Sequence, residues 1–209
     1  MARARLILAS GSPQRKELLS AAGYSFEIIV PDDSAECGIC STGGPAGMVR
    51  ELAFRKADNV RHHLAKRRNQ DDTPSILIAC DTVAECNGAI MGKPRHEDHA
   101  RQMLNVLRGQ VHRVYSGLCI WAYDGSPNNP SPETRIAITE LVMENVTDNA
   151  LDEYLASGLW RGKAGAFGYQ DRLSWLEIKQ GSQSNVIGLP MELLGEMLAP
   201  WDSQLHDRK

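Results

Sequence analysis

Asp81 is the residue whose position most clearly suits a chemical role, because it directly follows the apolar run SILIAC at 75–80. A short apolar run of this kind indicates a buried strand, and open α/β sheets bind their ligands at the carboxyl ends of their strands. A carboxylate there can hold a metal ion, deprotonate a water molecule, or do both. The alternative is an ordinary aspartate that caps the turn after the strand.

The segment SGSPQR at 10–15 has the composition of an anion-binding turn. It joins an apolar run to a helix start, where unpaired backbone N–H groups and the helix dipole face one point. Arg15 adds a planar, permanently charged group that suits phosphate oxygens. The alternative is an ordinary capped helix, because Ser12 and Pro13 are also favoured at helix starts.

Two lysines lie at positions where a positive charge could bind a phosphate. Lys56 falls in a column with Leu52, Val60 and Leu64, at a spacing of four residues that predicts the apolar side of a helix. Its ammonium could sit over a pocket and meet a polyphosphate, or its stem could simply run across the apolar face. Lys93, in the sequence GKP, supplies another cation on a stiff loop.

The segment KAGAFGYQ at 163–170 combines small residues with a terminal amide. Small residues let the backbone approach a ligand closely, and the Gln170 amide can both donate to and accept from a nucleobase edge. A single Gly-rich turn is weak evidence by itself. The segment GSQSNVIGLP at 181–190 is expected to be a second polar edge or a helix cap.

The elements that would position these residues alternate between strands and helices. Apolar runs and alternation predict strands at 5–9, 26–30, 75–80, 111–123, 135–143 and 173–178. Periodicity and capping residues predict helices at 13–22, 46–68, 97–107, 148–158 and 190–198.

The remaining segments complete the predicted architecture. Asn87-Gly88 is a dipeptide typical of a two-residue hairpin, whereas 31–46 and 181–188 are expected to be loops. Strands that alternate with helices, together with one hairpin, predict an α/β fold with a mixed sheet. The length of 209 residues suits one domain, here expected at 1–200 with a C-terminal tail at 201–209.

Composition narrows the class of protein. The 26 acidic and 23 basic side chains give a formal charge of -3, which argues against a surface for nucleic acid. No stretch approaches the roughly 20 apolar residues of a membrane span, and the first apolar run is too short for a signal peptide. We therefore expect a cytoplasmic protein that has no nucleic-acid or membrane partner.

The five cysteines cannot all pair internally, and in a chain of this size they predict reduced thiols rather than a disulfide framework. Cys37 and Cys40 form one Cys-x-x-Cys, which could be half of a zinc site or a redox pair. No second such motif follows, so a zinc site is the less favoured interpretation.

Seven strings in order carry a resemblance to a known family. They are LILASGSPQRKELL, LAFRKA, ACDTV, GKP, MLNVLRGQVHRVYSGL, KAGAFGYQ and NVIGLP. Together they resemble the Maf family of nucleoside triphosphate pyrophosphatases from about residue 6 to about residue 198. Each string is short, but their order over nearly the whole chain is far more specific than any one of them.

The resemblance implies a Maf/ITPase-like fold, with a twisted mixed sheet flanked by helices and two lobes around a nucleotide cleft. It also implies a divalent cation, magnesium or manganese, and attack of water at the α-phosphorus of a nucleoside triphosphate. Asp81 corresponds to the proton acceptor, and Asp81 and Glu36 to the metal-side acids. The phosphate-binding positions are Ser10, Arg15, Lys56 and Lys93. A homodimer is a further suggestion of the resemblance.

Substrate choice in this family follows three positions, which fall here on Gln14, Thr82 and Gln170. Thr82 and Gln170 look like the branch that acts on dTTP and UTP. Gln14 departs from the family pattern Ser-Pro-Arg-Arg and removes one cation from the pocket mouth, so the base preference stays open.

The resemblance to the family also suggests a regulatory role and a role in the cell's nucleotide pool. The alternative to an enzyme is a nucleotide-sensing regulator of cell division with little turnover. Nucleotide-pool cleaning is a further suggestion of the family. Asp81 together with three cations favours catalysis, because a sensor has no need for a carboxylate that activates water.

Overall fold

The computed structural model describes residues 4–37, 43–67, 73–125, 130–171 and 174–205. The strands are β1 (Arg5–Leu8), β2 (Glu27–Ile28), β3 (Ser75–Cys86), β4 (Ala89–Met91), β5 (Val111–Tyr123), β6 (Glu133–Met143) and β7 (Leu176–Gln180). The α-helices are α1 (Pro13–Ala21), α2 (Gly44–Arg67), α3 (Glu97–Leu107), α4 (Asp148–Ser157), α5 (Gln183–Ile187) and α6 (Met191–Leu198). Short 3-10 helices are η1 (Asp33–Glu36), η2 (Ala164–Ala166), η3 (Tyr169–Asp171) and η4 (Ala199–Trp201).

The strands form one mixed sheet in the order β2-β1-β3-β5-β6-β7, with β4 paired to β3. β1 is parallel to β2 and to β3, whereas every pair from β3 onward is antiparallel. The hairpin turn between β3 and β4 has positive φ at Asn87 and Gly88, as its dipeptide predicts. The prediction of an α/β fold with a mixed sheet is therefore confirmed.

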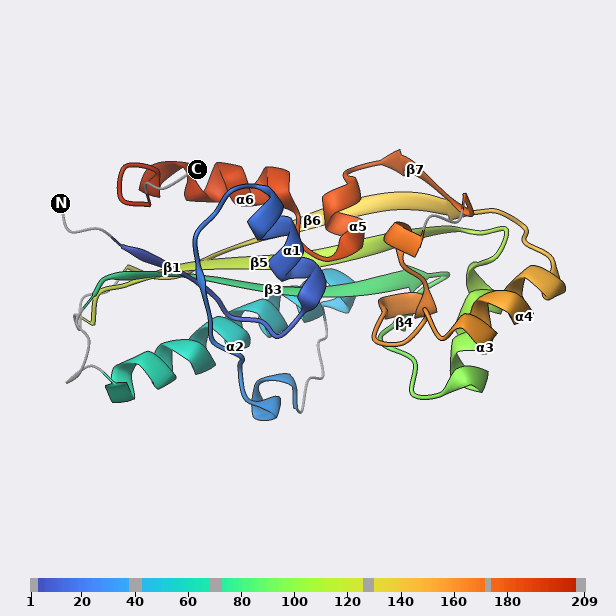
Figure 1. Ribbon diagram of the computed structural model, residues 1–209, viewed down its shortest axis with the longest axis horizontal. Helices are drawn as coiled ribbons and strands as arrows, with labels where there is room; N and C mark the ends of the chain where they lie inside the picture. Colours follow the sequence, from blue (N-terminus) through green and yellow to red (C-terminus); the bar gives the residue numbers. More distant parts are fainter. Residues whose placement is uncertain (1–3, 38–42, 68–72, 126–129, 172–173, 206–209) are drawn as a thin grey trace.

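Helices cover both faces of this sheet (Figure 1). α2 lies on one face, and α1 and α6 lie on the other, while α3 and α4 gather at the end of the sheet where β4 lies. Gly117 lets α2 approach β5 closely, because a Cβ at this position would lie 2.1 Å from the Val49 carbonyl oxygen. Ser12 and Thr147 cap α1 and α4 through their hydroxyls, as the sequence predicts.

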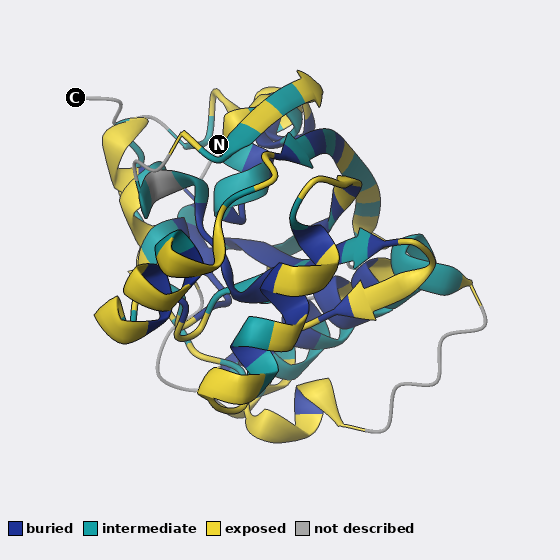
Figure 2. Cartoon of the chain, turned by 90° about the vertical axis from the view of Figure 1, so that its right-hand side faces the viewer, coloured by how far each residue is buried: buried dark blue, intermediate teal, exposed yellow. Residues whose placement is uncertain are grey.

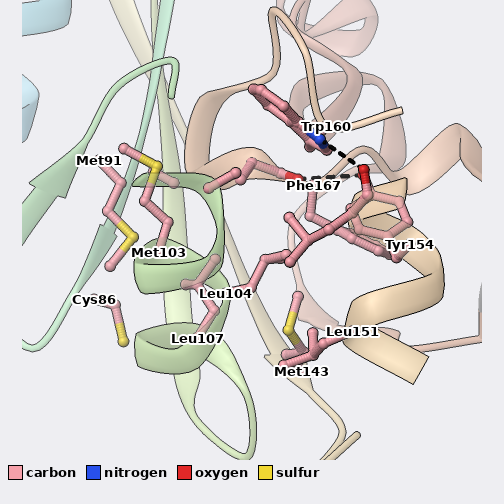
Figure 3. Packing of buried hydrophobic residues seen from close by; sticks show 14 of the residues in the cluster. Cys86, Met91, Met103, Leu104, Leu107, Met143, Leu151, Tyr154, Trp160 and Phe167 are labelled. Carbon is pink, nitrogen blue, oxygen red and sulfur yellow. Dashed lines mark hydrogen bonds between the residues drawn. The ribbon is translucent and has the colours of Figure 1, made fainter. Parts of the chain in front are cut away.

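The buried side chains divide into three clusters. The α2-side cluster includes Ile7, Ala53, Val60, Leu77 and Cys119. The α6-side cluster includes Leu8, Leu19, Ile78, Leu118 and Leu194. The distal cluster, drawn in Figure 3, includes Met103, Leu107, Met143, Leu151, Tyr154 and Phe167. Figure 2 shows that the buried strands occupy the centre and that exposed helix surfaces lie outside.

β3 is longer than the predicted strand, and this corrects the placement of Asp81. The strand continues to Cys86, so Asp81 and Thr82 lie inside it and not at its end. β5 pairs with β3 continuously from Ser75, opposite Tyr123, to Glu85, opposite Arg113. An unbroken neighbour on one side satisfies the backbone of β3 beyond residue 80, and the two-residue turn at Asn87-Gly88 fixes where the strand ends.

Three other predicted segments differ from the structure. The expected loop at 181–188 contains α5, whose first turn is capped by the Ser182 hydroxyl. The expected loop at 31–46 contains η1 and the start of α2. The described part of the expected tail packs on the molecule, since Trp201 and Leu205 contact the α6-side cluster.

Cys37, Cys80, Cys86 and Cys119 are free thiols, whereas Cys40 lies outside the described residues. The described part of the chain holds no group of three or more acidic, histidine or cysteine side chains arranged to bind a metal ion. None of the described helices combines the length and the apolar character required to cross a bilayer.

Candidate active site

A cleft of about 880 Å³ opens where one edge of β3 lacks a strand neighbour. On this edge β1 pairs with β3 only as far as Ile78, and the pairing of β3 with β4 starts at Ala84, opposite Met91. The intervening residues of β3 include Asp81 and Thr82, and both line the cleft. The predicted site residues that line it are Ser10, Gln14, Arg15, Glu36, Lys56, Asp81, Thr82 and Lys93.

Lys56 lies between the two predicted metal-side carboxylates. Its Nζ is 2.5 Å from Asp81 Oδ1 and 2.7 Å from Glu36 Oε1. The side chains of Lys56 and Asp81 are only 8% and 13% exposed, whereas that of Glu36 is 59% exposed. The hydrogen bond from Lys56 is the main cause that lowers the pKa of Glu36, with smaller contributions from the charges of Lys93 and Arg15 and an opposing one from burial. The prediction that Lys56 lies on the buried side of its helix is confirmed. The partners of its ammonium in the structure are two carboxylates.

Asp81 and Glu36 have the donor set of a magnesium or manganese site. Both carboxylates reach the same point, the Lys56 ammonium, so their oxygens could converge on one cation once that ammonium moves. Magnesium is commonly held by one or two carboxylates together with substrate phosphates and water. The two carboxylates that share Lys56 match the number of protein ligands that such a site commonly uses.

Arg15 is buried and organises the opposite side of the cleft. Its guanidinium donates from Nε to the Gly188 carbonyl at 2.8 Å, and its other nitrogens donate to Ser10 Oγ at 3.1 Å and Thr82 Oγ1 at 3.4 Å. The Gly188 carbonyl also accepts from Thr82 Oγ1 at 3.2 Å and from the Cys80 thiol at 3.3 Å. The Gly188 carbonyl, directly after α5, thus holds the Arg15 guanidinium, the Thr82 hydroxyl and the Cys80 thiol together.

Gln14 lies on the first turn of α1, within the anion-binding segment. Its side-chain oxygen accepts a hydrogen bond of 3.0 Å from the Ser12 hydroxyl, which also caps the helix at the Arg15 N–H. The neutral amide therefore completes a local capping network where the family pattern places an arginine. Gln14 brings no positive charge to the cleft.

The last two predicted residues lie on loops that contact each other. Lys93 is exposed on one wall, and the preceding Gly92 accepts a backbone hydrogen bond of 3.0 Å from Gly165 N. Gln170 lies in η3, but its side chain is outside the part of the molecule that is described. The role of Gln170 therefore stays a prediction.

The cleft also has lining residues that the sequence reasoning missed. Arg161 and Lys163 add cations to its wall, and Val114, Leu141, Met143, Phe167 and Leu176 give its far end an apolar lining. His112 lies at this end and is only 5% exposed. The alternation of β5, in which His112 and Val114 face the same side, was the signal that could have found it.

His112 should make folding stability depend on pH. Burial lowers the pKa of His112 below 6.5, against a weaker opposing effect of the Gln110 carbonyl. At acidic pH, His112 therefore binds a proton more readily in the unfolded chain than in the folded chain. The contribution of His112 to stability is complete above its pKa in the unfolded chain and is lost as the pH falls below that pKa. The Tm of the wild type should fall between about pH 7.5 and about pH 5.5, and we expect a smaller fall in His112→Gln. The difference should be about 2–4 °C for each kcal/mol of pH-dependent unfolding free energy that the substitution removes.

Thermal unfolding at both pH values tests this expectation. His62→Gln is the control, because the His62 side chain lies on the surface of α2 and is 56% exposed. An unchanged pH dependence in His112→Gln would show that other groups set it.

The chain is similar to known proteins over most of its length. A family model described as "Maf-like protein" matches residues 5–201. A dTTP/UTP pyrophosphatase of Rhodopirellula baltica is 49% identical over 194 residues, covering 92% of this chain and 80% of the relative. A dTTP/UTP pyrophosphatase of Alkaliphilus metalliredigens is 38% identical over 197 residues, covering 93% of this chain and 94% of the relative.

Among solved structures, a nucleoside-triphosphatase / dITP/XTP pyrophosphatase from Mycobacterium abscessus aligns with a TM-score of 0.38 at 11% identity. The alignment covers 95% of this chain and 98% of that chain. This similarity is too distant to carry an argument.

Proposed function

The chain belongs to the Maf-like protein family, and from this premise we propose that it is a nucleoside triphosphate pyrophosphatase that acts on dTTP and UTP. The observation that carries the proposal is the contact of Lys56 with both Asp81 and Glu36 inside the cleft. The names of the relatives in Rhodopirellula and Alkaliphilus support the same class of reaction and the same substrates.

Asp81 is the proton acceptor in this proposal. It takes a proton from a water molecule, which attacks the α-phosphorus, and the bond to the bridging oxygen of the β-phosphate breaks to release pyrophosphate. A divalent cation, when held by Asp81 and Glu36, supplies positive charge for the triphosphate and for the attacking water. Asp81 is a strand residue in a wall of the cleft, so the water it orients is held by a rigid element.

Three side-chain cations balance the charge of the triphosphate and of the leaving pyrophosphate. Arg15 presents a guanidinium that is already fixed by Gly188, Ser10 and Thr82. Lys56 leaves its carboxylate partners to meet a phosphate, and Lys93 approaches from the exposed wall. Catalysis of phosphoryl transfer depends mostly on such positioning and electrostatic stabilisation.

The base would lie toward the apolar end of the cleft. Thr82 stands at the entrance to that end, where its hydroxyl contacts Ser116 Oγ at 2.8 Å, and Gln170 follows the Gly-rich turn. A flat pyrimidine suits an apolar pocket with few polar groups. Gln14 caps its own helix in place of a cation, so base choice rests on Thr82 and Gln170.

The test is pyrophosphate release from dTTP, UTP, CTP and GTP with magnesium or manganese. We expect kcat/KM for dTTP and UTP to exceed that for the other nucleotides by about tenfold or more, as for a site that reads base hydrogen bonds. In water enriched with heavy oxygen, the label should enter the monophosphate, because water attacks the α-phosphorus.

Other outcomes would change the proposal. Label in the pyrophosphate would place the attack at the β-phosphorus, and a broad or purine profile would show that Gln14 has changed the pocket. Nucleotide binding with no product would favour the nucleotide-sensing regulator.

Two properties outside the site are part of the proposal. The family resemblance suggests a homodimer, and light scattering after size exclusion should then give twice the chain mass of 23.0 kDa. A cytoplasmic location follows from the composition and is tested by cell fractionation.

A further inference from the structure

A buried carboxylate that the proposed mechanism does not use is paired with Lys163, a residue of the cleft wall. The Asp171 side chain is only 3% exposed and forms an ion pair with Lys163, whose side chain is 13% exposed. Its other oxygen accepts from the Tyr154 hydroxyl at 2.6 Å and from the Gly168 N–H at 3.3 Å. A charge is costly to bury unless it is paired and hydrogen-bonded, and Asp171 satisfies both conditions.

These contacts close the segment 163–171 on itself. Lys163 begins the segment and Asp171 ends it, so their ion pair joins its two ends. Gly168 stands against the Lys163 stem so closely that a Cβ there would lie 2.8 Å from Lys163 Cδ. The Lys163 ammonium is thereby directed to Asp171, although Lys163 lines the cleft.

The enclosed segment has an unusual backbone that needs such support. Gly165 has a φ of 67° and Ala166 a φ of 63°, and a positive φ is uncommon for a residue with a side chain. The Ala166 carbonyl accepts a hydrogen bond of 3.2 Å from Tyr154, and Gly165 N donates to Gly92 beside Lys93. The segment is therefore held from α4 on one side and from the Lys93 loop on the other.

Aromatic packing supports the same arrangement. The Tyr154 ring lies 5.0 Å from that of Phe167 and 5.5 Å from that of Trp175, measured between centroids. Figure 3 shows Tyr154 beside Phe167 at the edge of the distal cluster. Burial, and then the hydrogen bond to Asp171, raise the pKa of Tyr154, so its hydroxyl stays a donor.

We propose that Asp171 is a positioning residue that sets the nucleobase-reading geometry of the turn that carries Gln170. Gln170 precedes Asp171 within η3, and the Asp171 backbone N–H closes this turn on the Gly168 carbonyl at 3.0 Å. Asp171 therefore fixes the turn through both its backbone N–H and its side-chain carboxylate. The inference rests on the proposed function, because it assigns Gln170 to the base.

The test compares base selectivity in Asp171→Asn, Tyr154→Phe and the wild type. We expect Asp171→Asn to lower the ratio of kcat/KM for UTP over CTP by about tenfold, mostly through a higher KM for UTP, as for the loss of an aligned hydrogen bond. Tyr154→Phe keeps the aromatic ring and should shift the ratio in the same direction by a smaller factor. Asp152→Asn is the matched control, since Asp152 lies on α4 and pairs with the surface residue Arg101.

A second measurement separates this inference from the proposed function. The ratio of Kd values for UMP and CMP, measured by calorimetry, reports base reading without any turnover. A wild type without pyrophosphate release would overturn the proposed function, and the Kd ratio would still decide the role of Asp171. If both ratios stay at wild-type values in folded Asp171→Asn, the positioning role is wrong. If that variant does not fold, Tyr154→Phe decides by the same criteria.

Discussion

Asp81→Asn should reduce pyrophosphate release by a factor of about 100 or more, the usual size of a general-base contribution. Asparagine keeps the shape of aspartate and can still accept the hydrogen bond from Lys56, which is 2.5 Å long in the wild type. It cannot accept a proton from water at neutral pH, and it brings no negative charge to a cation. Turnover with UTP, measured beside the Tm, should therefore fall while the protein remains folded.

A surface aspartate provides the control for Asp81. Asp58 pairs with Arg61 at 2.8 Å on α2, so Asp58→Asn removes one negative charge and leaves the cleft unchanged. Turnover of that variant should equal the wild-type value. If Asp81→Asn retained near-normal turnover, another group would have to activate the water, and the assignment of Asp81 would be wrong.

Lys56→Met should produce two opposite effects. Turnover should fall by about 100-fold, because a charge that stabilises the transition state is lost. Binding of manganese without nucleotide should become tighter by about tenfold or more, because the ammonium between Asp81 and Glu36 no longer competes and the two carboxylates then repel each other. Calorimetry with manganese alone measures this second effect independently of turnover.

Lys93→Met is the control for this pair of measurements. Lys93 is an exposed cation on the cleft wall, and among the described residues it forms no ion pair with Asp81 or Glu36. Its loss should weaken the binding of UTP, and it should change manganese binding much less than Lys56→Met does, because Lys93 acts on Glu36 only through its charge. Manganese binding that is no tighter in Lys56→Met would mean that the metal does not bind between Asp81 and Glu36.

Local signals were sufficient for much of the framework. Ser12 and Thr147 are hydroxyl caps whose helices begin at the next residue, and Asn87-Gly88 adopts the positive φ values that its turn demands. Lys56 interrupts an apolar column, and this break in the pattern located a buried cation of the cleft. Each of these features depends on residues that are close in sequence.

The remaining features depend on contacts between distant segments. The pairing of β5 with β3 carries the strand through Asp81, and the apolar run that ends at Cys80 does not show this pairing. The pairing of Lys56 with Glu36 joins α2 to η1, and the pattern predicted a phosphate partner because it contains no information about η1. Asp171 is missed for a similar reason, since its partners Lys163 and Tyr154 become neighbours only after folding.

The Gly188 carbonyl has a consequence for how the protein is made. It accepts hydrogen bonds from Arg15, which precedes it by 173 positions, and from Thr82. Chains leave the ribosome from the amino terminus, and long proteins begin to fold during synthesis. The Arg15 side of the cleft therefore has to wait for the last part of the chain to emerge. A nascent chain that ends before Gly188 would carry Ser10, Lys56 and Asp81 but would lack the carbonyl that fixes Arg15, so this side of the cleft can form only after nearly the whole chain has been made.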